Sequence, residues 1–127
     1  MQATKDRSFL ISVVDDDISV RESLKNLLQS IGFRVEAFSG AEEFLASNCI
    51  SSTRCLILDI RMGGMSGLEL QQHLKEHHYS IPIVFISAKV SKAVRENVLA
   101  EGAVDCLIKP LTEADLLSAV NKALNSS

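Results

Sequence analysis

The side chains most capable of chemistry in this sequence occur in four short segments. They are the acidic run Asp15–Asp17, the isolated acid Asp59, the hydroxyl of Ser87 and the ammonium group of Lys109. Carboxylates that converge repel one another unless a cation lies between them, and hard oxygen ligands at a hydrated crevice suit Mg²⁺. A hydroxyl and an ammonium group beside such a cation would orient a phosphoryl group and neutralise its charge. One carboxylate oxygen could then act as the nucleophile and form an aspartyl phosphate.

Each of these segments also has an ordinary structural explanation. An acidic run that follows a strand is more often a turn or a helix cap, and a single Asp, Ser or Lys is usually structural or solvated. The chemical interpretation therefore depends on whether the fold brings the four segments together.

Apolar runs of strand length recur along the chain. Four of them are rich in β-branched residues and predict strands inside a sheet: Phe9–Val14, Cys55–Leu58, Ile83–Ile86 and Val104–Ile108. The run Arg34–Phe38 alternates instead, which predicts an edge strand with one hydrated face.

Helical patterns separate these runs, and several have recognisable ends. Gly32 follows the first helical pattern as a C-terminal cap. Four pairs have the spacing of a capping box, namely Ser19/Glu22, Ser39/Glu42, Ser66/Glu69 and Thr112/Asp115.

Five strands in strict alternation with five helices predict an α/β fold with a parallel sheet and helices on both faces. We expect the flavodoxin-like strand order 2-1-3-4-5, in which ligands bind outside the carboxyl ends of the strands. The four chemical segments end the first, third, fourth and fifth strands. The fold therefore predicts that they meet at one crevice.

Composition limits the remaining possibilities. The 127 residues suit a single domain, 1–127, with a core of about 8–125, and the net charge of −3 provides no positive field for nucleic acid or an anionic membrane. No apolar run approaches the length of a membrane span, and we expect a cytoplasmic protein.

The three cysteines, Cys49, Cys55 and Cys106, lack the spacing of a zinc site or a disulfide framework. They are expected to be buried or half-buried thiols.

The motifs VVDDD, LILDIRM, FISAK and CLIKP, in this order and at these separations, resemble the receiver domain of two-component response regulators. The resemblance extends from Phe9 to about Leu124. The segments GFRVEAFSGAEEFL and EGAVDCLIKPL are most similar to the nitrogen-fixation regulator type, whose full-length members usually continue into a helix-turn-helix DNA-binding domain. No such segment occurs within these 127 residues, so any contact with DNA would need another part of the protein.

The resemblance implies a metal site and a phosphoacceptor. Asp59 matches the phosphoacceptor, and Asp16 matches the direct Mg²⁺ ligand. Asp15 matches the neighbouring acid that acts through a bound water, and the backbone carbonyl of Arg61 completes the metal site.

The resemblance also implies the groups that respond to phosphorylation. Ser87 matches the switch hydroxyl, and Lys109 matches the lysine that pairs with the phosphoryl group and precedes a cis proline, Pro110. Asp17 matches no ligand position and is expected to help start the first helix.

By the same resemblance, the phosphoryl donor is a sensor histidine kinase, and the only reactions catalysed are the domain's own phosphorylation and dephosphorylation. Phosphorylation would favour a homodimer through the surface of the fourth helix and fifth strand, and it would regulate transcription through a domain outside this sequence.

Two positions depart from the family pattern. Gly63 stands where the family usually has proline, and glycine widens the conformations open to the loop after Asp59. Cys106 stands where an aromatic ring usually turns inward on phosphorylation. We expect the loop Ala88–Lys92 and Ser87 to carry the coupling instead; alternatively, Cys106 lies half-exposed at the strand surface and matters little.

Two other functions fit parts of the sequence. A pseudo-receiver would keep the fold as a phosphorylation-independent interaction module, which the intact acids, Ser87 and Lys109 disfavour. A phosphohydrolase of the haloacid-dehalogenase type would need a second acid two residues after its nucleophile, and Arg61 occupies that position after Asp59.

Overall fold

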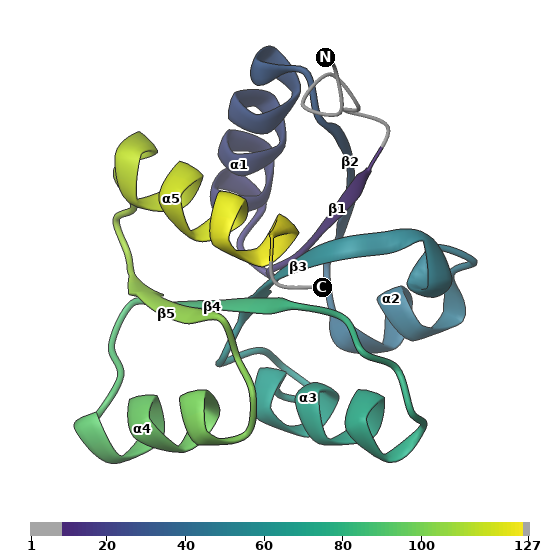
Figure 1. Ribbon diagram of the computed structural model, residues 1–127, viewed down its shortest axis with the longest axis vertical. Helices are drawn as coiled ribbons and strands as arrows, with labels where there is room; N and C mark the ends of the chain where they lie inside the picture. Colours follow the sequence, from purple (N-terminus) through teal and green to yellow (C-terminus); the bar gives the residue numbers. More distant parts are fainter. Residues whose placement is uncertain (1–8, 126–127) are drawn as a thin grey trace.

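The structure is a computed structural model that describes residues 9–125, and within them it contains a five-stranded parallel sheet in the order β2-β1-β3-β4-β5 (Figure 1). The predicted α/β class and strand order are confirmed. The strands are β1 (Leu10–Val14), β2 (Arg34–Phe38), β3 (Thr53–Asp59), β4 (Ile83–Ser87) and β5 (Asp105–Ile108). The helices are α1 (Ile18–Ile31), α2 (Ala41–Ala46), α3 (Gly67–Glu76), α4 (Lys92–Ala100) and α5 (Glu113–Leu124), with a 3-10 turn, η2 (Ile50–Ser52), before β3.

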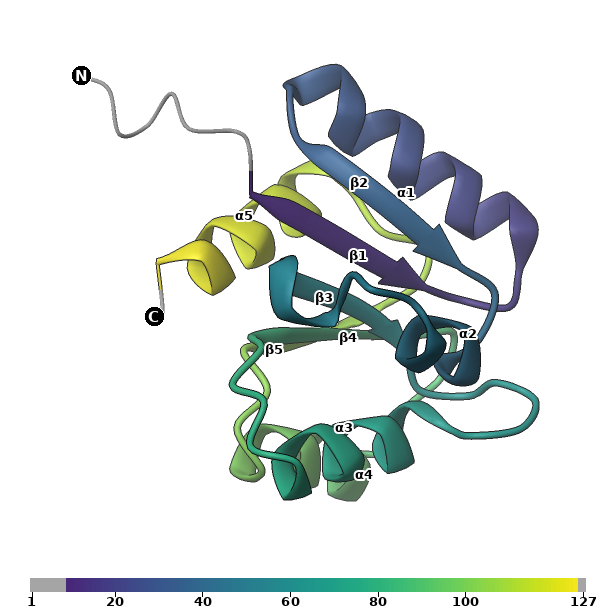
Figure 2. The same cartoon turned by 90° about the vertical axis from the view of Figure 1, so that its right-hand side faces the viewer.

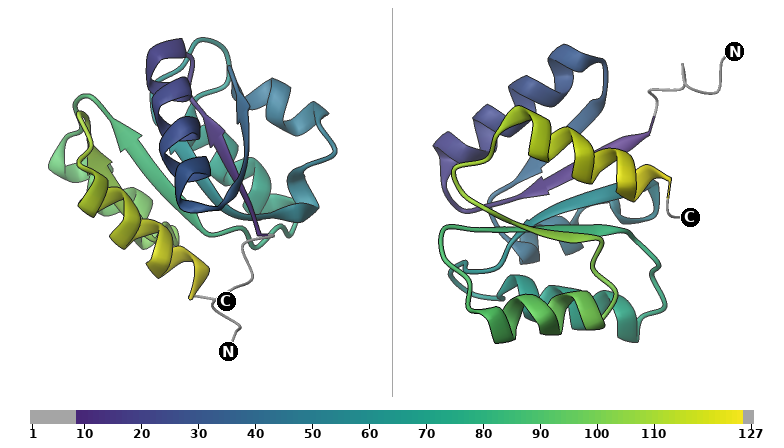
Figure 3. Two further views of the ribbon diagram at one scale, coloured as in Figure 1. Left: turned by 90° about the horizontal axis from the view of Figure 1, so that it is seen from above. Right: turned by 60° about the vertical axis from the view of Figure 1, so that its left-hand side comes forward.

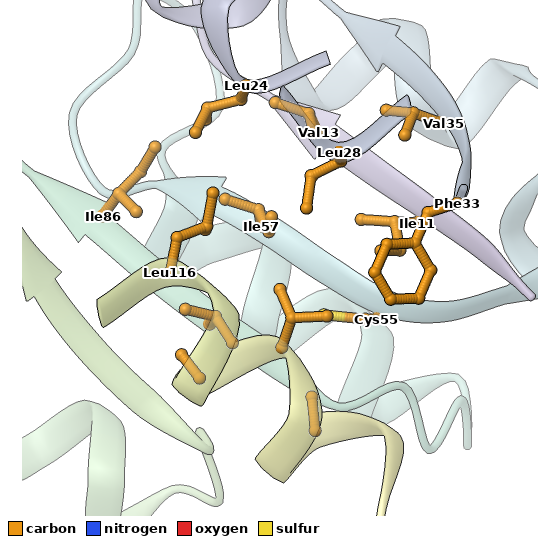
Figure 4. Packing of buried hydrophobic residues seen from close by; sticks show 14 residues of the cluster. Ile11, Val13, Leu24, Leu28, Phe33, Val35, Cys55, Ile57, Ile86 and Leu116 are labelled. Atoms are coloured by element: carbon orange, nitrogen blue, oxygen red, sulfur yellow. The ribbon is translucent and has the colours of Figure 1, made fainter. Parts of the chain in front are cut away.

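The helices cover both faces of the sheet, and a separate apolar cluster fills each interface. α1 and α5 pack on one face, and α2, α3 and α4 on the other (Figures 2 and 3). Leu28 of α1 and Leu116 of α5 meet Ile57 of β3 in the first cluster (Figure 4). Because β3 is central and covered on both faces, its side chains can be apolar on both sides.

β1 and β4 are buried along their whole length, whereas β2 alternates between buried and exposed positions. The prediction of an edge strand at Arg34–Phe38 is confirmed. The prediction that the other four strands lie inside was wrong for β5, which forms the second edge and leaves Ile108 47% exposed. An open sheet has two edges, and the apolar sequence of β5 does not indicate that this strand forms the second edge.

The helix ends match the sequence in part. The complete capping box at Ser66 and Glu69 and the Thr112 cap are confirmed, and Gly32 ends α1 in the left-handed conformation with φ 112°. The other two predicted boxes, Ser19/Glu22 and Ser39/Glu42, were wrong. The N-cap of α1 is Asp17, two residues before Ser19, and the N-cap of α2 is Gly40.

The cysteines lie as expected, with Cys55 and Cys106 buried, Cys49 half-buried and all three thiols free. Among the described residues, no helix combines the length and the apolar character needed to cross a bilayer.

The start of α3 packs directly against the end of β3. A Cβ atom added to Gly67 would lie 2.3 Å from the carbonyl oxygen of Asp59, a separation that requires backbone movement. A Cβ atom added to Gly63, four residues earlier, would meet nothing within 4 Å.

These two glycines provide a matched comparison. Gly67→Ala is expected to lower the free energy of unfolding by about 1–3 kcal/mol, because the added methyl group overpacks a fixed backbone contact. Gly63→Ala should change it by less than about 0.5 kcal/mol. Urea unfolding followed by circular dichroism measures both, and equal losses would contradict the close approach of α3 to β3.

Candidate functional site

Three acidic side chains meet at the carboxyl edge of the sheet. Asp15 and Asp16 follow β1, Asp59 ends β3, and one carboxylate oxygen from each lies within 4.8 Å of the others. Asp15 is fully buried and Asp59 nearly so, whereas Asp16 is exposed. The convergence expected from the strand order is present.

Among the described residues, Lys109 balances part of this charge. Lys109 follows β5 and places Nζ 2.9 Å from Asp15 Oδ2 and 3.5 Å from Asp59 Oδ2. Apart from this ion pair with Lys109, the buried Asp15 Oδ2 has no hydrogen-bond partner within residues 9–125. Three carboxylates facing one ammonium group leave an excess of negative charge on hard oxygen ligands. The cluster therefore fits a divalent cation such as Mg²⁺.

Burial and crowding change the acidity of the site. Burial, followed by the charge of Asp15, raises the pKa of Asp59 from 3.8 to about 6, although Lys109 and the Arg61 amide act in the opposite direction. Burial alone would lower the pKa of Lys109, but its contacts with Asp15 and Asp59 outweigh burial and raise it. Lys109 is therefore positively charged at neutral pH.

The loop between β3 and α3 lies over the acidic cluster. The Arg61 amide donates to Asp59 Oδ1 at 3.3 Å, and the Gly63 amide donates to Asp16 Oδ2 at 3.4 Å. These contacts place the Arg61 backbone beside the cluster, while the role of its carbonyl as a metal ligand stays a prediction.

Two side chains make contacts near the site that the sequence did not indicate. Glu42 of α2 accepts a hydrogen bond from the Met65 amide at 2.8 Å, instead of forming the predicted box with Ser39. Arg95 of α4 donates to the carbonyl of Cys106 and lies 3.7 Å from Asp105 Oδ1. Both contacts join residues distant in sequence, and no local spacing indicates them.

Ser87 ends β4 with its hydroxyl turned along the β4–α4 loop. Its Oγ donates to the Lys89 carbonyl at 2.8 Å and accepts from the Lys89 amide at 3.3 Å. A bond from this hydroxyl to a group on Asp59 would require it to leave the Lys89 carbonyl.

Cys106 is buried, with 1% of its surface exposed, in the apolar cluster that contains Phe85 and Val98. The alternative that it lies half-exposed was wrong, because its side chain points under α4 rather than toward solvent. Burial raises the pKa of its thiol.

The remaining predicted positions agree with the structure. The Lys109–Pro110 peptide bond is cis. Asp17 is not part of the acidic cluster and caps α1, since its carboxylate accepts a hydrogen bond from the Ser19 amide at 2.9 Å.

Comparison with known proteins identifies relatives over nearly the whole chain. Residues 11–121 match the family model described as response regulator receiver domain. The transcriptional regulatory protein TdiR of Thauera aromatica is 44% identical over 98% of this chain and 55% of its own length. The chain spans about half the length of the curated relatives it matches first.

Solved structures agree with this assignment. The response regulator StyR is 47% identical, with a TM-score of 0.83 over 91% of this chain and 58% of that one. The crystal structure of FixJ-N is 31% identical, with a TM-score of 0.84 over all of this chain and 98% of that one.

The raised pKa of Asp59 predicts how the metal-free protein responds to pH. As pH rises from about 4 to about 6, the unfolded chain releases the Asp59 proton before the folded chain does, so stability falls and the loss persists above pH 6. Asp59→Asn should therefore stabilise the protein at pH 7.5 in EDTA by about 1–3 kcal/mol, at roughly 1.4 kcal/mol per pKa unit.

Urea unfolding at pH 7.5 and pH 4 measures this difference, and most of the gain should vanish at pH 4. Asp17→Asn is the control, because asparagine keeps the helix cap and Asp17 lies outside the cluster. A gain of the same size at both pH values would show that the charge of Asp59 is not its origin.

Proposed function

The chain belongs to the response regulator receiver family, and we propose that it is a phosphorylation-controlled receiver in which Asp59 accepts the phosphoryl group with Mg²⁺. Receiver domains in general bind Mg²⁺ at an acidic cluster and receive the phosphoryl group from sensor histidine kinases. The observation that carries the proposal is the convergence of Asp15, Asp16 and Asp59 beside Lys109.

Each residue of the crevice has a separate role in this proposal. Asp15 and Asp16 would hold the cation together with the Arg61 carbonyl, and Mg²⁺ bound there would supply positive charge to the oxygens of the transferring group. A carboxylate oxygen of Asp59 forms a bond to phosphorus as the phosphorus–nitrogen bond of a phosphohistidine donor breaks. Lys109 keeps its proton and neutralises charge on the new aspartyl phosphate.

The partners follow from this chemistry. The donor is a sensor histidine kinase, and the domain catalyses only its own phosphorylation and dephosphorylation. Relatives such as TdiR are named transcriptional regulators and are about twice as long as this chain. We therefore infer that the output is transcriptional and is exerted through a DNA-binding domain outside these 127 residues.

Acetyl phosphate with Mg²⁺ is expected to add one phosphoryl group to the purified chain, on Asp59. Intact-mass spectrometry should find the added mass in the wild type and in Asp17→Asn, which keeps its helix cap, but not in Asp59→Asn. Modification that persists in Asp59→Asn would contradict the assignment. A wild type that accepts no phosphoryl group from acetyl phosphate or a kinase would instead favour the phosphorylation-independent interaction module.

The phosphoryl signal needs a path from Asp59 to the surface. Ser87 is joined through Lys89 to the loop that begins α4, and Arg95 joins α4 to β5. Leu99 of α4 and Ile108 of β5 are large apolar side chains exposed by 37% and 47%. Movement of Ser87 toward the phosphoryl group would shift α4 relative to β5 and change the exposure of these two side chains, and we infer a homodimer through α4 and β5.

Beryllofluoride, which stands in for the phosphoryl group, is expected to convert the protein from monomer toward dimer in sedimentation experiments. Ser87→Ala should weaken this response about tenfold or more, since it removes a hydrogen bond to a charged group. Cys106→Ala should leave the response nearly intact, and Ile108→Glu should abolish the dimer. If Ser87→Ala dimerises normally and Cys106→Ala does not, coupling through the β4–α4 loop is wrong.

A further inference from the structure

The loop between β3 and α3 is fixed at both ends but contains two adjacent glycines in its middle. At one end, the Arg61 amide binds Asp59, and at the other, Ser66 forms a complete capping box and Gly67 packs against the Asp59 carbonyl. Between them lie Gly63 and Gly64, which impose few restrictions on the backbone. The Gly63 amide makes only a long hydrogen bond to Asp16, at 3.4 Å, so without a stronger contact the loop over the acidic cluster would have many conformations.

Glu42 provides such a contact from a different element. Its Oε2 accepts the Met65 amide at 2.8 Å, across 23 positions of sequence. The same carboxylate lies over the loop so closely that a Cβ atom on Gly64 would be 2.6 Å from Oε2. Gly64 also has φ 74°, in the left-handed region that favours glycine, so both its conformation and its missing side chain suit this contact.

The carboxylate is presented from a well-anchored helix. Ala41 and Phe44, on either side of Glu42 in α2, are fully buried, and the Phe44 ring packs edge-on against Phe38 at 5.4 Å. The next residue, Glu43, binds the Ser39 amide and hydroxyl instead, at 2.6 and 2.9 Å. Two consecutive acids of the same helix therefore serve different parts of the molecule.

We propose that Glu42 is a positioning residue for the metal site, because its hydrogen bond to Met65 holds the β3–α3 loop in place over Asp16 and Asp59. This hydrogen bond limits the backbone conformations of the loop, as a less flexible residue in place of Gly63 would. It also keeps the Arg61 backbone and the Gly63 amide beside the carboxylates. The inference rests on the proposed Mg²⁺ site and deepens it.

Nuclear magnetic resonance can test the loop and the metal site separately. Amide hydrogen exchange without metal reports whether Met65 is held, and a Mg²⁺ titration of amide shifts gives the dissociation constant. Glu42→Ala should speed Met65 exchange and raise the Mg²⁺ dissociation constant about three- to tenfold, which is less than the whole contribution of one charge-assisted hydrogen bond because the loop transmits only part of that loss to the metal site. Glu43→Ala removes the same charge one residue away and should leave both measurements unchanged.

Two further variants separate positioning from charge. Glu42→Gln keeps an acceptor oxygen without the charge and should stay within about twofold of the wild-type dissociation constant, since most of the hydrogen bond is retained. Gly63→Ala combined with Glu42→Ala should recover part of the affinity, because alanine restricts the loop and meets no atom within 4 Å.

The outcomes distinguish this inference from the proposed function. A wild type that binds no Mg²⁺ would overturn the metal site itself. If the wild type binds Mg²⁺ and Glu42→Ala matches it, or if Glu42→Gln is as weak as Glu42→Ala, the positioning role of Glu42 is wrong.

Discussion

The repulsion between carboxylates at the end of a buried sheet is the constraint on which the site depends. β1 and β3 are apolar and adjacent, so Asp15 and Asp59, which continue them, are brought together with little water to separate their charges. Lys109 offsets one negative charge, which leaves the crevice short of positive charge. The repulsion between the carboxylates would drive them apart, so the rest of the fold must hold them together.

The two walls of the crevice are built differently. The β3–α3 wall is closed by backbone contact at Gly67, by the Ser66 capping box and by Glu42. The β4–α4 wall is held by the hydrogen bonds between Ser87 and Lys89, which can exchange for other partners without disturbing packing. In the proposed function, the fixed β3–α3 loop would hold the cation site in place, and the adjustable β4–α4 loop would respond to the phosphoryl group through Ser87.

Much of the fold could be predicted because it depends on local patterns. Periodicity and β-branched composition located every strand, although β3 extends to Thr53 and Asp59 at its two ends beyond the apolar run. The order of strands then predicted the meeting of Asp15, Asp59 and Lys109. The family resemblance added the roles of Arg61 and Ser87, which composition and spacing could not supply.

The errors and omissions have a common physical origin. Capping-box spacing is short and recurs by chance, so Ser19 and Ser39 matched the pattern while Asp17 and Gly40 occupy the caps. The contacts of Glu42 and Arg95 are tertiary, and they depend on how α2 and α4 are oriented over the sheet. The second edge at β5 was missed because the burial of a strand depends on its neighbours as well as its own side chains.

The sequence separation of the paired charges has a consequence for how the protein is made. Asp59 and Lys109 are 50 positions apart, and Lys109 follows the last strand. A chain still emerging from the ribosome contains both buried acids before it contains Lys109, so any pairing of β1 and β3 at that stage lacks this ammonium group. The crevice is therefore among the last features to mature during synthesis, and a chain truncated before β5 cannot complete it.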